Sequence, residues 1–151
     1  MIEIIENYVD QEFEQQVVNA LPRQMRKGYG RSVIRYGSSI PYSKNVISPD
    51  IPKIFDRFKE DIEFDSVTIN HYKPGELIDW HIDDYKAGPV IFVISLLNDA
   101  NIDFRLNNEL KSYLLPRYSL VKFSDDMRYK WEHHVRVSQE RYSIVLRNGK
   151  I

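Results

Sequence analysis

The second half of the chain constrains the fold most, because it is a close succession of short β-rich segments. From residue 64 onward, turn residues separate six such runs: SVTINHYK, VIFVISL, NIDFRL, YSLVKF, YKWEHHV and RYSIVLR. Short strands at this spacing are typical of a β-sandwich or a jelly-roll barrel. Asn107-Asn108 predicts a hairpin turn, because asparagine tolerates positive φ. We therefore expect a double-stranded β-helix (jelly-roll) over residues 64–148.

The first 63 residues have a different pattern, in which helical spacing dominates. Asp10 is a suitable N-cap for a helix that ends at Pro22, and residues 51–61 predict a second, short helix. The run SVIRYG between them predicts a strand. The 151 residues contain no repeat or linker, so we expect one domain over 1–151. This gives a mainly β (α+β) fold, with N-terminal helices and a candidate substrate lid in 1–63.

The amino-acid composition limits which metal ligands the chain can offer and where in the cell it is expected. The chain has no cysteine, which excludes disulfides and thiolate metal ligands. Its acidic start is unlike a signal or transit peptide, and no apolar run approaches the roughly 20 residues that span a bilayer. We expect a monomer without membrane contact, located in the cytoplasm or, in a eukaryotic or viral host, in the nucleus.

The segment Trp80-His81-Ile82-Asp83-Asp84 holds the strongest candidate for a metal site. In an extended segment, residues i and i+2 point the same way, so His81 and Asp83 can reach one ion together. A second histidine would complete a set of two imidazoles and one carboxylate. That set leaves coordination positions open and suits Fe(II) that must also bind a cosubstrate and dioxygen.

The third ligand must come from His71, His133 or His134. His133 shares a strand face with Trp131 and Val135, and this face is expected to look inward. His134 falls on the other face and is the alternative, since a bulge would reverse the parity. His71 is expected to pack on the outside of the fold.

The last strand carries two arginines on one face. Arg141, Ser143, Val145 and Arg147 alternate with apolar residues that face the other way. A dianionic ligand would neutralise two inward guanidinium groups, and arginine grips carboxylates in a bidentate fork. From the residues alone, the opposite interpretation stays open: both arginines could lie at the solvated ends of the strand.

The motifs, taken in order, resemble those of the AlkB-like Fe(II)/2-oxoglutarate-dependent dioxygenases. The similarity covers about residues 64–148, with the runs N-x-Y-x-x-G from residue 70, I-D-W-H-x-D-D from 78, G-P-V-I from 88, L-P-R-x-S-L from 115 and R-Y-x-W-x-H-x-V from 128. The ending R-x-S-x-x-x-R from residue 141 is similar to the family signature R-x-N-x-T-x-R. Single motifs are weak, whereas the ordered set is specific.

The resemblance implies a role for each matching position. His81, Asp83 and His133 would be the iron ligands and the catalytic centre, and Arg141 would pair with the distal carboxylate of 2-oxoglutarate. The remaining cosubstrate contacts would come from Asn70, Tyr72, Ser143 and Arg147.

The chain also departs from the family pattern. Ser143 and Val145 replace the family's Asn and Thr, and only the serine can still form a hydrogen bond. His134 stands where the family usually has Gly. Tyr85 replaces an acid that many nucleic-acid dealkylases carry, which weakens the case for base reading at this position.

A nucleic-acid substrate is the first functional hypothesis: hydroxylation or demethylation in DNA repair or RNA modification. Residues 21–48 contain six Lys and Arg and no acid, with interleaved tyrosines that could stack on a single-stranded or flipped base. The candidate substrate residues are Arg31, Arg35, Tyr36, Tyr42, Asp84 and Tyr85. Alternatives are a protein or peptide side chain as substrate, or a non-catalytic barrel that binds a metal or a 2-oxo acid. Arg128 is expected to be an exposed strand residue.

Overall fold

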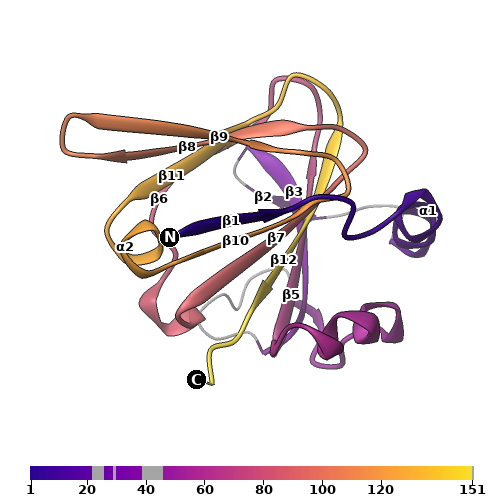
Figure 1. Cartoon of the computed structure of the whole chain (residues 1–151). Coiled ribbons are helices and arrows are strands. Elements are labelled where there is room, and N and C mark those ends of the chain that lie inside the picture. The colour runs from indigo at the N-terminus through magenta and orange to yellow at the C-terminus, as the bar shows by residue number, and fades with distance from the viewer. Residues whose placement is uncertain (22–25, 29, 39–45, 151) are drawn as a thin grey trace.

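Two β-sheets face each other in the computed structural model, which describes residues 1–21, 26–28, 30–38 and 46–150 (Figure 1). Within this part of the chain, the large sheet has the strand order β1 (Ile2–Ile5), β10 (Leu120–Ser124), β7 (Val90–Leu96), β12 (Arg141–Arg147), β5 (Ser66–Tyr72), β3 (Arg31–Gly37) and β2 (Arg26–Gly28), with β4 (Val46–Ser48) paired to β3. The small sheet has the order β6 (Leu77–His81), β11 (Glu132–Arg136), β8 (Ala100–Leu106) and β9 (Glu109–Leu115).

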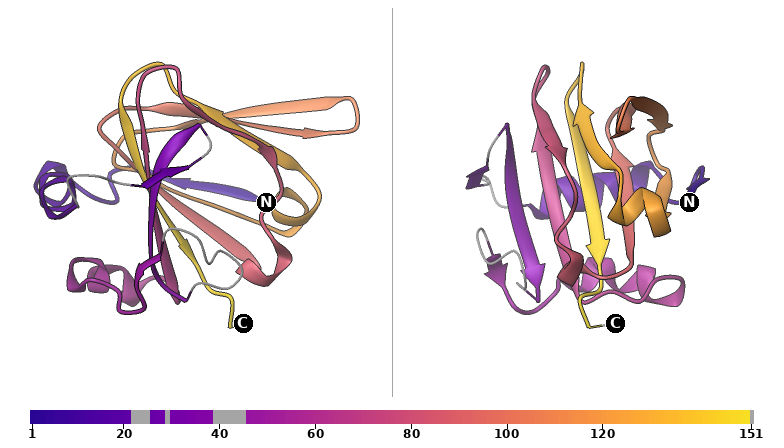
Figure 2. Two further views of the ribbon diagram at one scale, coloured as in Figure 1. Left: turned by 180° about the vertical axis from the view of Figure 1, so that it is seen from behind. Right: turned by 90° about the vertical axis from the view of Figure 1, so that its left-hand side faces the viewer.

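Helical segments cover the outer face of the large sheet (Figure 2). Helix α1 (Gln11–Ala20) begins as expected, because the Asp10 carboxylate accepts a hydrogen bond from Phe13 N at 2.9 Å. The second expected helix is a 3-10 helix, η1 (Lys53–Glu60), rather than an α-helix. Two shorter segments, η2 (Tyr85–Ala87) and α2 (Asp125–Tyr129), lie in loops. None of the described helices has the length and apolar character needed to cross a bilayer.

Two hydrophobic cores result from strand alternation. Ile144 and Leu146 of β12 point to the helices, where they pack in a cluster that includes Phe13 and Phe58. Val145 of the same strand points the other way, into a second cluster between the two sheets. Successive residues of one strand therefore serve two different layers.

The runs expected as strands mostly become strands. Those at 90–96 and 141–147 match β7 and β12 residue for residue, and the hairpin between β8 and β9 turns at Asn107 with φ of 55°. The sheets form an open double-stranded β-helix rather than a closed barrel.

Two expectations were wrong. Residues 1–63 are not only helical with one strand, since β1, β2 and β4 also lie there; β1 pairs with β10 at the sheet edge. The run expected as a strand from residue 129 becomes one only at Glu132, because the chain first turns through α2. In both cases, pairing with a distant strand decides the local structure, and local propensity does not report that pairing.

Candidate metal centre and cosubstrate cavity

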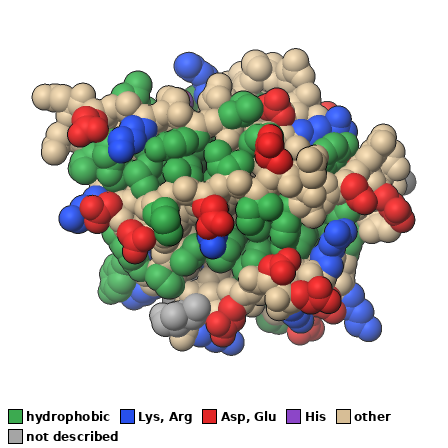
Figure 3. All heavy atoms as spheres, viewed as in Figure 1, with side chains coloured by type: hydrophobic (Ala, Val, Ile, Leu, Met, Phe, Trp, Pro, Cys, Tyr) green, Lys and Arg blue, Asp and Glu red, His purple; other side chains and the backbone are tan. Residues whose placement is uncertain are grey.

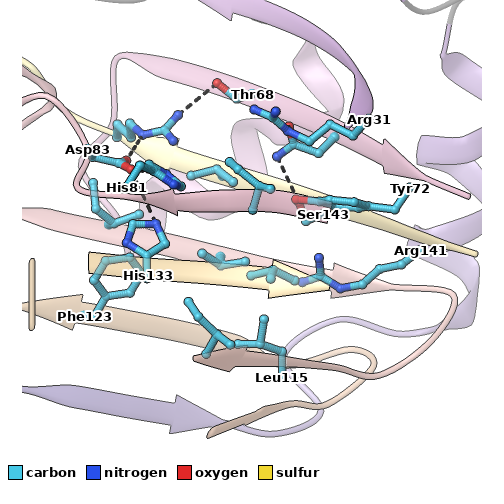
Figure 4. Close-up of a pocket in the computed structure, with 18 of the residues that line it drawn as sticks. Arg31, Thr68, Tyr72, His81, Asp83, Leu115, Phe123, His133, Arg141 and Ser143 are labelled. Carbon is cyan, nitrogen blue, oxygen red and sulfur yellow. Dashed lines mark hydrogen bonds and ion pairs between the residues drawn. The ribbon is translucent and has the colours of Figure 1, made fainter. Parts of the chain in front are cut away.

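Three side chains, from two neighbouring strands of the small sheet and the loop after one of them, converge at one end of a cavity between the sheets (Figure 4). His81 ends β6, Asp83 follows two residues later, and His133 lies on β11 directly opposite His81. Their ligand atoms all lie within 4.8 Å of one another. His81 Nε2 is 3.2 Å from Asp83 Oδ1, and His133 Nε2 is 3.6 Å from the same oxygen. The geometry allows one ion to contact all three.

The structure brings His133 to this point, and it places the other two candidate histidines elsewhere. His134 points to the opposite face of the small sheet, where it stacks on Trp80. His71 stacks on Tyr142 and contacts Glu140, away from the cavity. The side chains of β11 therefore alternate as expected, with His133 pointing into the cavity and His134 pointing away from it.

Asp83 is held in its ionised form and in one orientation. Its Oδ2 accepts a hydrogen bond from Arg147 Nε at 2.8 Å, and Arg147 also donates to Thr68 Oγ1 at 3.0 Å. Burial favours the protonated carboxyl, but the Arg147 guanidinium, followed by the hydrogen bond to His81, outweighs it and holds the pKa of Asp83 well below its usual range. Oδ1 is thereby left to face the two imidazoles as an anionic ligand.

The two imidazoles are suited to bind a metal as neutral ligands. Burial lowers the pKa of His133 to about 3, against the opposing effect of Asp83, so this ring is uncharged at neutral pH. His81 Nδ1 lies 2.7 Å from Asp79 O, so it carries the proton, and Nε2 is free to coordinate. Two neutral imidazoles with one carboxylate fit Fe(II) well, and thiolate-binding metals poorly.

Arg128 was expected to be exposed, and this prediction was wrong. The side chain is 1% exposed and donates to three carbonyl oxygens, those of Asp83 (2.9 Å), Asp84 (2.7 Å) and Gly88 (2.9 Å). Residue 128 lies on α2 rather than on a strand, and its side chain turns inward. Arg128 therefore fixes the backbone of the loop that presents Asp83.

Arg141 of β12 lies at the other end of the cavity (Figure 4). Arg141 is 1% exposed and donates from Nη2 to Ser95 Oγ at 2.8 Å. Its buried Nε has no hydrogen-bond partner among the described residues. Burial lowers the pKa of Arg141, against the opposing effect of Tyr72. A carboxylate ligand would supply both the missing acceptor and the charge, so this end fits 2-oxoglutarate.

Further polar residues line the cavity between these ends. Arg31 Nε donates to Asn70 Oδ1 at 2.9 Å, and Asn70 Nδ2 donates to Ser143 Oγ at 3.1 Å. Tyr72 and Arg147 also line this space. Because Arg141 and Arg147 both turn into this cavity, the interpretation of the two β12 arginines as solvated strand ends was wrong. The residues expected to contact the cosubstrate all reach one cavity.

The candidate substrate residues separate into three groups. Arg31 and Arg35 lie on the inner face of β3 and line the cavity. Tyr36 is 9% exposed and packs in the core on the opposite face, because side chains alternate along a strand; a role in base stacking is therefore excluded. Tyr42 lies outside the described residues.

The remaining two, Asp84 and Tyr85, lie in the loop beyond the metal ligands. The Asp84 carboxylate caps η2 by accepting from Lys86 N, and Tyr85 is 73% exposed. Neither is among the residues that line the cavity.

A second opening adjoins the metal end. It is more open to solvent than the cavity between the sheets, and most of its lining residues belong to both: Arg31, Arg35, Ile78, His81, Asp83 and Arg147. Its other lining residues are Asp79 and Trp80. A molecule entering here would meet His81 and Asp83, while Arg141 does not line this opening.

Comparison with known proteins identifies the class. The chain matches the 2OG-Fe(II) oxygenase superfamily over residues 4–147 and belongs to it. Enzymes of this class use Fe(II) and 2-oxoglutarate. Within the class the chain is AlkB-like. It is 27% identical over 153 residues to tRNA (carboxymethyluridine(34)-5-O)-methyltransferase alkbh8 of Xenopus tropicalis, covering 87% of this chain and 24% of that protein.

Other relatives extend this picture. Uncharacterized protein L905 of Acanthamoeba polyphaga mimivirus is 33% identical over 123 residues, covering 73% of this chain and 56% of that protein. The chain thus spans about a quarter of the frog protein and just over half of the viral one. The structure of OsALKBH1 aligns with a TM-score of 0.71 at 12% identity, covering 97% of both chains. A viral collagen prolyl hydroxylase from Paramecium Bursaria Chlorella virus-1 aligns with a TM-score of 0.66 at 13% identity, over 97% of this chain and 94% of that one. These two structures share the fold.

Proposed function

We propose that the chain is an Fe(II)- and 2-oxoglutarate-dependent dioxygenase that oxidises an alkyl or other modifying group on a nucleic acid. The observation that carries the proposal is the position of the arginine-lined second opening. It is lined by two of the three metal-ligating side chains, His81 and Asp83, while a separate buried arginine occupies the cosubstrate end. One cavity thus combines a site for a 2-oxo diacid with an entrance suited to a polyanion.

The ligands divide between the two ends of the cavity. His81, Asp83 and His133 would hold the iron, and Arg141 would hold the distal carboxylate of 2-oxoglutarate. The other groups expected to contact the cosubstrate are Asn70, Tyr72, Ser143 and Arg147. Fe(II) and 2-oxoglutarate, when bound, supply the oxidising chemistry: dioxygen is consumed, 2-oxoglutarate is converted to succinate and carbon dioxide, and a substrate C–H bond is hydroxylated.

The protein itself positions groups and excludes water. Arg147 keeps Asp83 charged and aimed at the two histidines, and Arg128 holds the loop backbone in place. Apolar side chains such as Ile91, Val93 and Val145 line the space between the two ends. They keep the reacting centre dry, which strengthens the ionic contacts at both ends.

The charge of the second opening favours an anionic substrate. Three of its lining side chains are guanidinium groups and two are carboxylates. Arg147 and Asp83 pair with each other, which leaves Arg31 and Arg35 against the single carboxylate of Asp79. By contrast, acidic and basic side chains are intermixed around broad hydrophobic areas on the face shown in Figure 3. A phosphate backbone close to Arg31 and Arg35 would bring an adjacent base toward His81.

The relatives support the same substrate class. The frog and mammalian proteins are named for action on tRNA. The methyltransferase activity in that name is not part of the proposal, since the chain matches only a quarter or less of those proteins.

The test has two arms on the full chain with Fe(II) and 2-oxoglutarate. Single-stranded DNA and RNA oligonucleotides bearing N-methylated bases should be demethylated, as measured by mass spectrometry, with formation of succinate. Binding of the same oligonucleotides, followed by fluorescence anisotropy, should weaken steeply as salt rises. Lys59→Ala removes one exposed positive charge on η1 and serves as the control, expected to bind like the wild type.

A protein or peptide substrate is the alternative that this test distinguishes. Salt-independent oligonucleotide binding without any modification would contradict the nucleic-acid assignment. If methylated or proline-containing peptides were oxidised under the same conditions, the cofactor assignment would stand and the substrate class would change. Without iron-dependent succinate formation on any substrate, the oxygenase proposal itself would fail.

A further inference from the structure

A row of packed side chains crosses the small sheet directly behind the proposed metal ligands. Trp80 of β6 stacks on His134 of β11, with ring centroids 4.7 Å apart and planes 13° from parallel. His134 Nδ1 lies 3.3 Å from Asp103 Oδ2 on β8, and Ser112 of β9 donates to Asp103 Oδ1 at 2.6 Å. The Arg105 guanidinium lies over the Trp80 ring, 4.2 Å from its centroid. The row involves all four strands of the small sheet. It lies on the outer face of this sheet, opposite to the face from which His133 points into the cavity.

A β-bulge lies at the end of this row. Asp79 and Trp80 together stand opposite His134, because the strand pairs on either side are separated by two residues on β6 and by one on β11. Ile78 and His81 are three residues apart, yet both line the cavity. Regular alternation would place them on opposite faces, so the bulge is what turns His81 inward.

The polar groups of the bulge are used to orient the ligand. Trp80 N donates to Asp79 Oδ1 at 2.8 Å, so the displaced amide is satisfied locally. The Asp79 carbonyl accepts from His81 Nδ1 at 2.7 Å. This contact sets the tautomer of His81 and directs its Nε2 toward Asp83 Oδ1, 3.2 Å away.

We propose that Trp80 and His134 are positioning residues for the metal centre. Their stack holds the bulge in one conformation, and the bulge in turn holds the Asp79 carbonyl against the His81 imidazole. His134 therefore has a role distinct from that of its neighbour His133: it acts on the metal from the outer face, through Trp80. The inference rests on the ligand set proposed above.

Binding of Ni(II) alone to the full chain, measured by isothermal titration calorimetry, tests this role without any turnover. Loss of a group that orients a metal ligand typically costs about 10–100-fold in metal affinity, and we expect a loss in this range for Trp80→Ala and for His134→Ala. Trp80→Phe keeps an aromatic face and should retain affinity within about threefold of the wild type. Because the two residues act as one unit, the double variant should bind little more weakly than either single variant.

The chain offers a matched control on the large sheet. His71 stacks on Tyr142 with centroids 4.3 Å apart and contacts Glu140 at 2.7 Å. Like His134, it therefore combines an aromatic stack with a carboxylate contact, and its chain neighbours Asn70 and Tyr72 line the cavity. His71→Ala should leave Ni(II) affinity unchanged. If Trp80→Ala and His134→Ala were folded by circular dichroism and bound Ni(II) like the wild type, the positioning role would be overturned.

His81→Ala in the same titration separates this inference from its premise. If His81→Ala binds Ni(II) like the wild type, the ligand set itself is wrong. If His81→Ala abolishes binding while Trp80→Ala and His134→Ala do not weaken it, only the positioning role is wrong. Should Trp80→Ala not fold, His134→Ala decides the matter, because it removes the smaller partner of the stack.

Discussion

The two faces of the large sheet come from the same strands but hold different kinds of side chain. On the outer face, Ile144 and Leu146 are completely buried against the helices. On the inner face, the alternate residues Arg141 and Ser143 are also buried, but they line the cavity. Strand alternation thus allows β12 to contribute stability on one side and chemistry on the other.

The difference has an energetic side. Buried apolar groups stabilise the fold in proportion to their area, whereas buried polar groups are costly unless they are fully paired. The inner face therefore contributes less to folding, because Arg141 Nε is buried there without a hydrogen-bond partner among the described residues, and a bound ligand would supply one. Substitutions in the outer core and around the cavity should separate loss of stability from loss of function, and the following variants test this separation.

The largest effect is expected from His81→Ala. Removing a metal ligand should lower iron-dependent succinate formation by at least about 1,000-fold, since the metal contributes several kcal/mol to catalysis. The His81 side chain is 30% exposed, so the melting temperature without metal should change little. Coupled succinate and thermal-unfolding assays measure both. Wild-type turnover in this variant would contradict the assignment of His81 as a metal ligand.

Ile144→Ala should show the reverse behaviour. Removing a fully buried side chain from the outer core should cost about 3 kcal/mol of unfolding free energy, measured by urea denaturation. The rate of succinate formation per folded molecule should stay close to that of the wild type at low temperature. A large loss of activity in fully folded protein would show that the two faces are not independent.

Arg141→Leu should weaken 2-oxoglutarate binding while sparing the fold. Charge-assisted hydrogen bonds of about 1.5–3 kcal/mol correspond to roughly a 10–100-fold loss in affinity. The stability of the ligand-free protein should stay the same or rise, because an incompletely paired buried cation is removed. Calorimetry measures the affinity for 2-oxoglutarate, and thermal unfolding measures the stability of the ligand-free protein. A strongly destabilised variant would indicate that Arg141 is structural.

The smallest effects are expected for oligonucleotide binding by variants of two neighbouring residues on β3, Arg35 and Tyr36. Arg35→Ala should lower oligonucleotide affinity several-fold and make the salt dependence shallower by about one unit of slope, as expected for one lost phosphate contact. Tyr36→Phe, one residue along and on the other face, should not change oligonucleotide binding. Equal losses in both variants would contradict the assignment of β3 faces.

Strand periodicity and ordered motifs were sufficient to predict most of the functional half of the molecule. The runs at 90–96 and 141–147 were placed correctly, and the parity argument selected His133 over His134. The strand positions and the inward orientation of His133 agree with the structure because alternation is a local property, and because β11 itself carries no bulge. Metal binding by His133 stays a prediction.

Features that depend on distant contacts were not predictable in this way. Arg128 was placed outside because nothing local shows that three loop carbonyls need a donor. Tyr36 was assigned to the substrate from its basic neighbours, although the strand register turns it into the core. The bulge at Asp79 and Trp80 depends on pairing with β11, which spacing along β6 alone does not show.

Binding of 2-oxoglutarate with and without metal tests most directly whether one cavity holds both cofactors. Calorimetric titration into Ni(II)-loaded protein should give one site per chain, with affinity at least about tenfold higher than for metal-free protein. By the same linkage, 2-oxoglutarate should tighten Ni(II) binding by an equal factor. Equal affinity for 2-oxoglutarate in the presence and absence of metal would contradict a shared site.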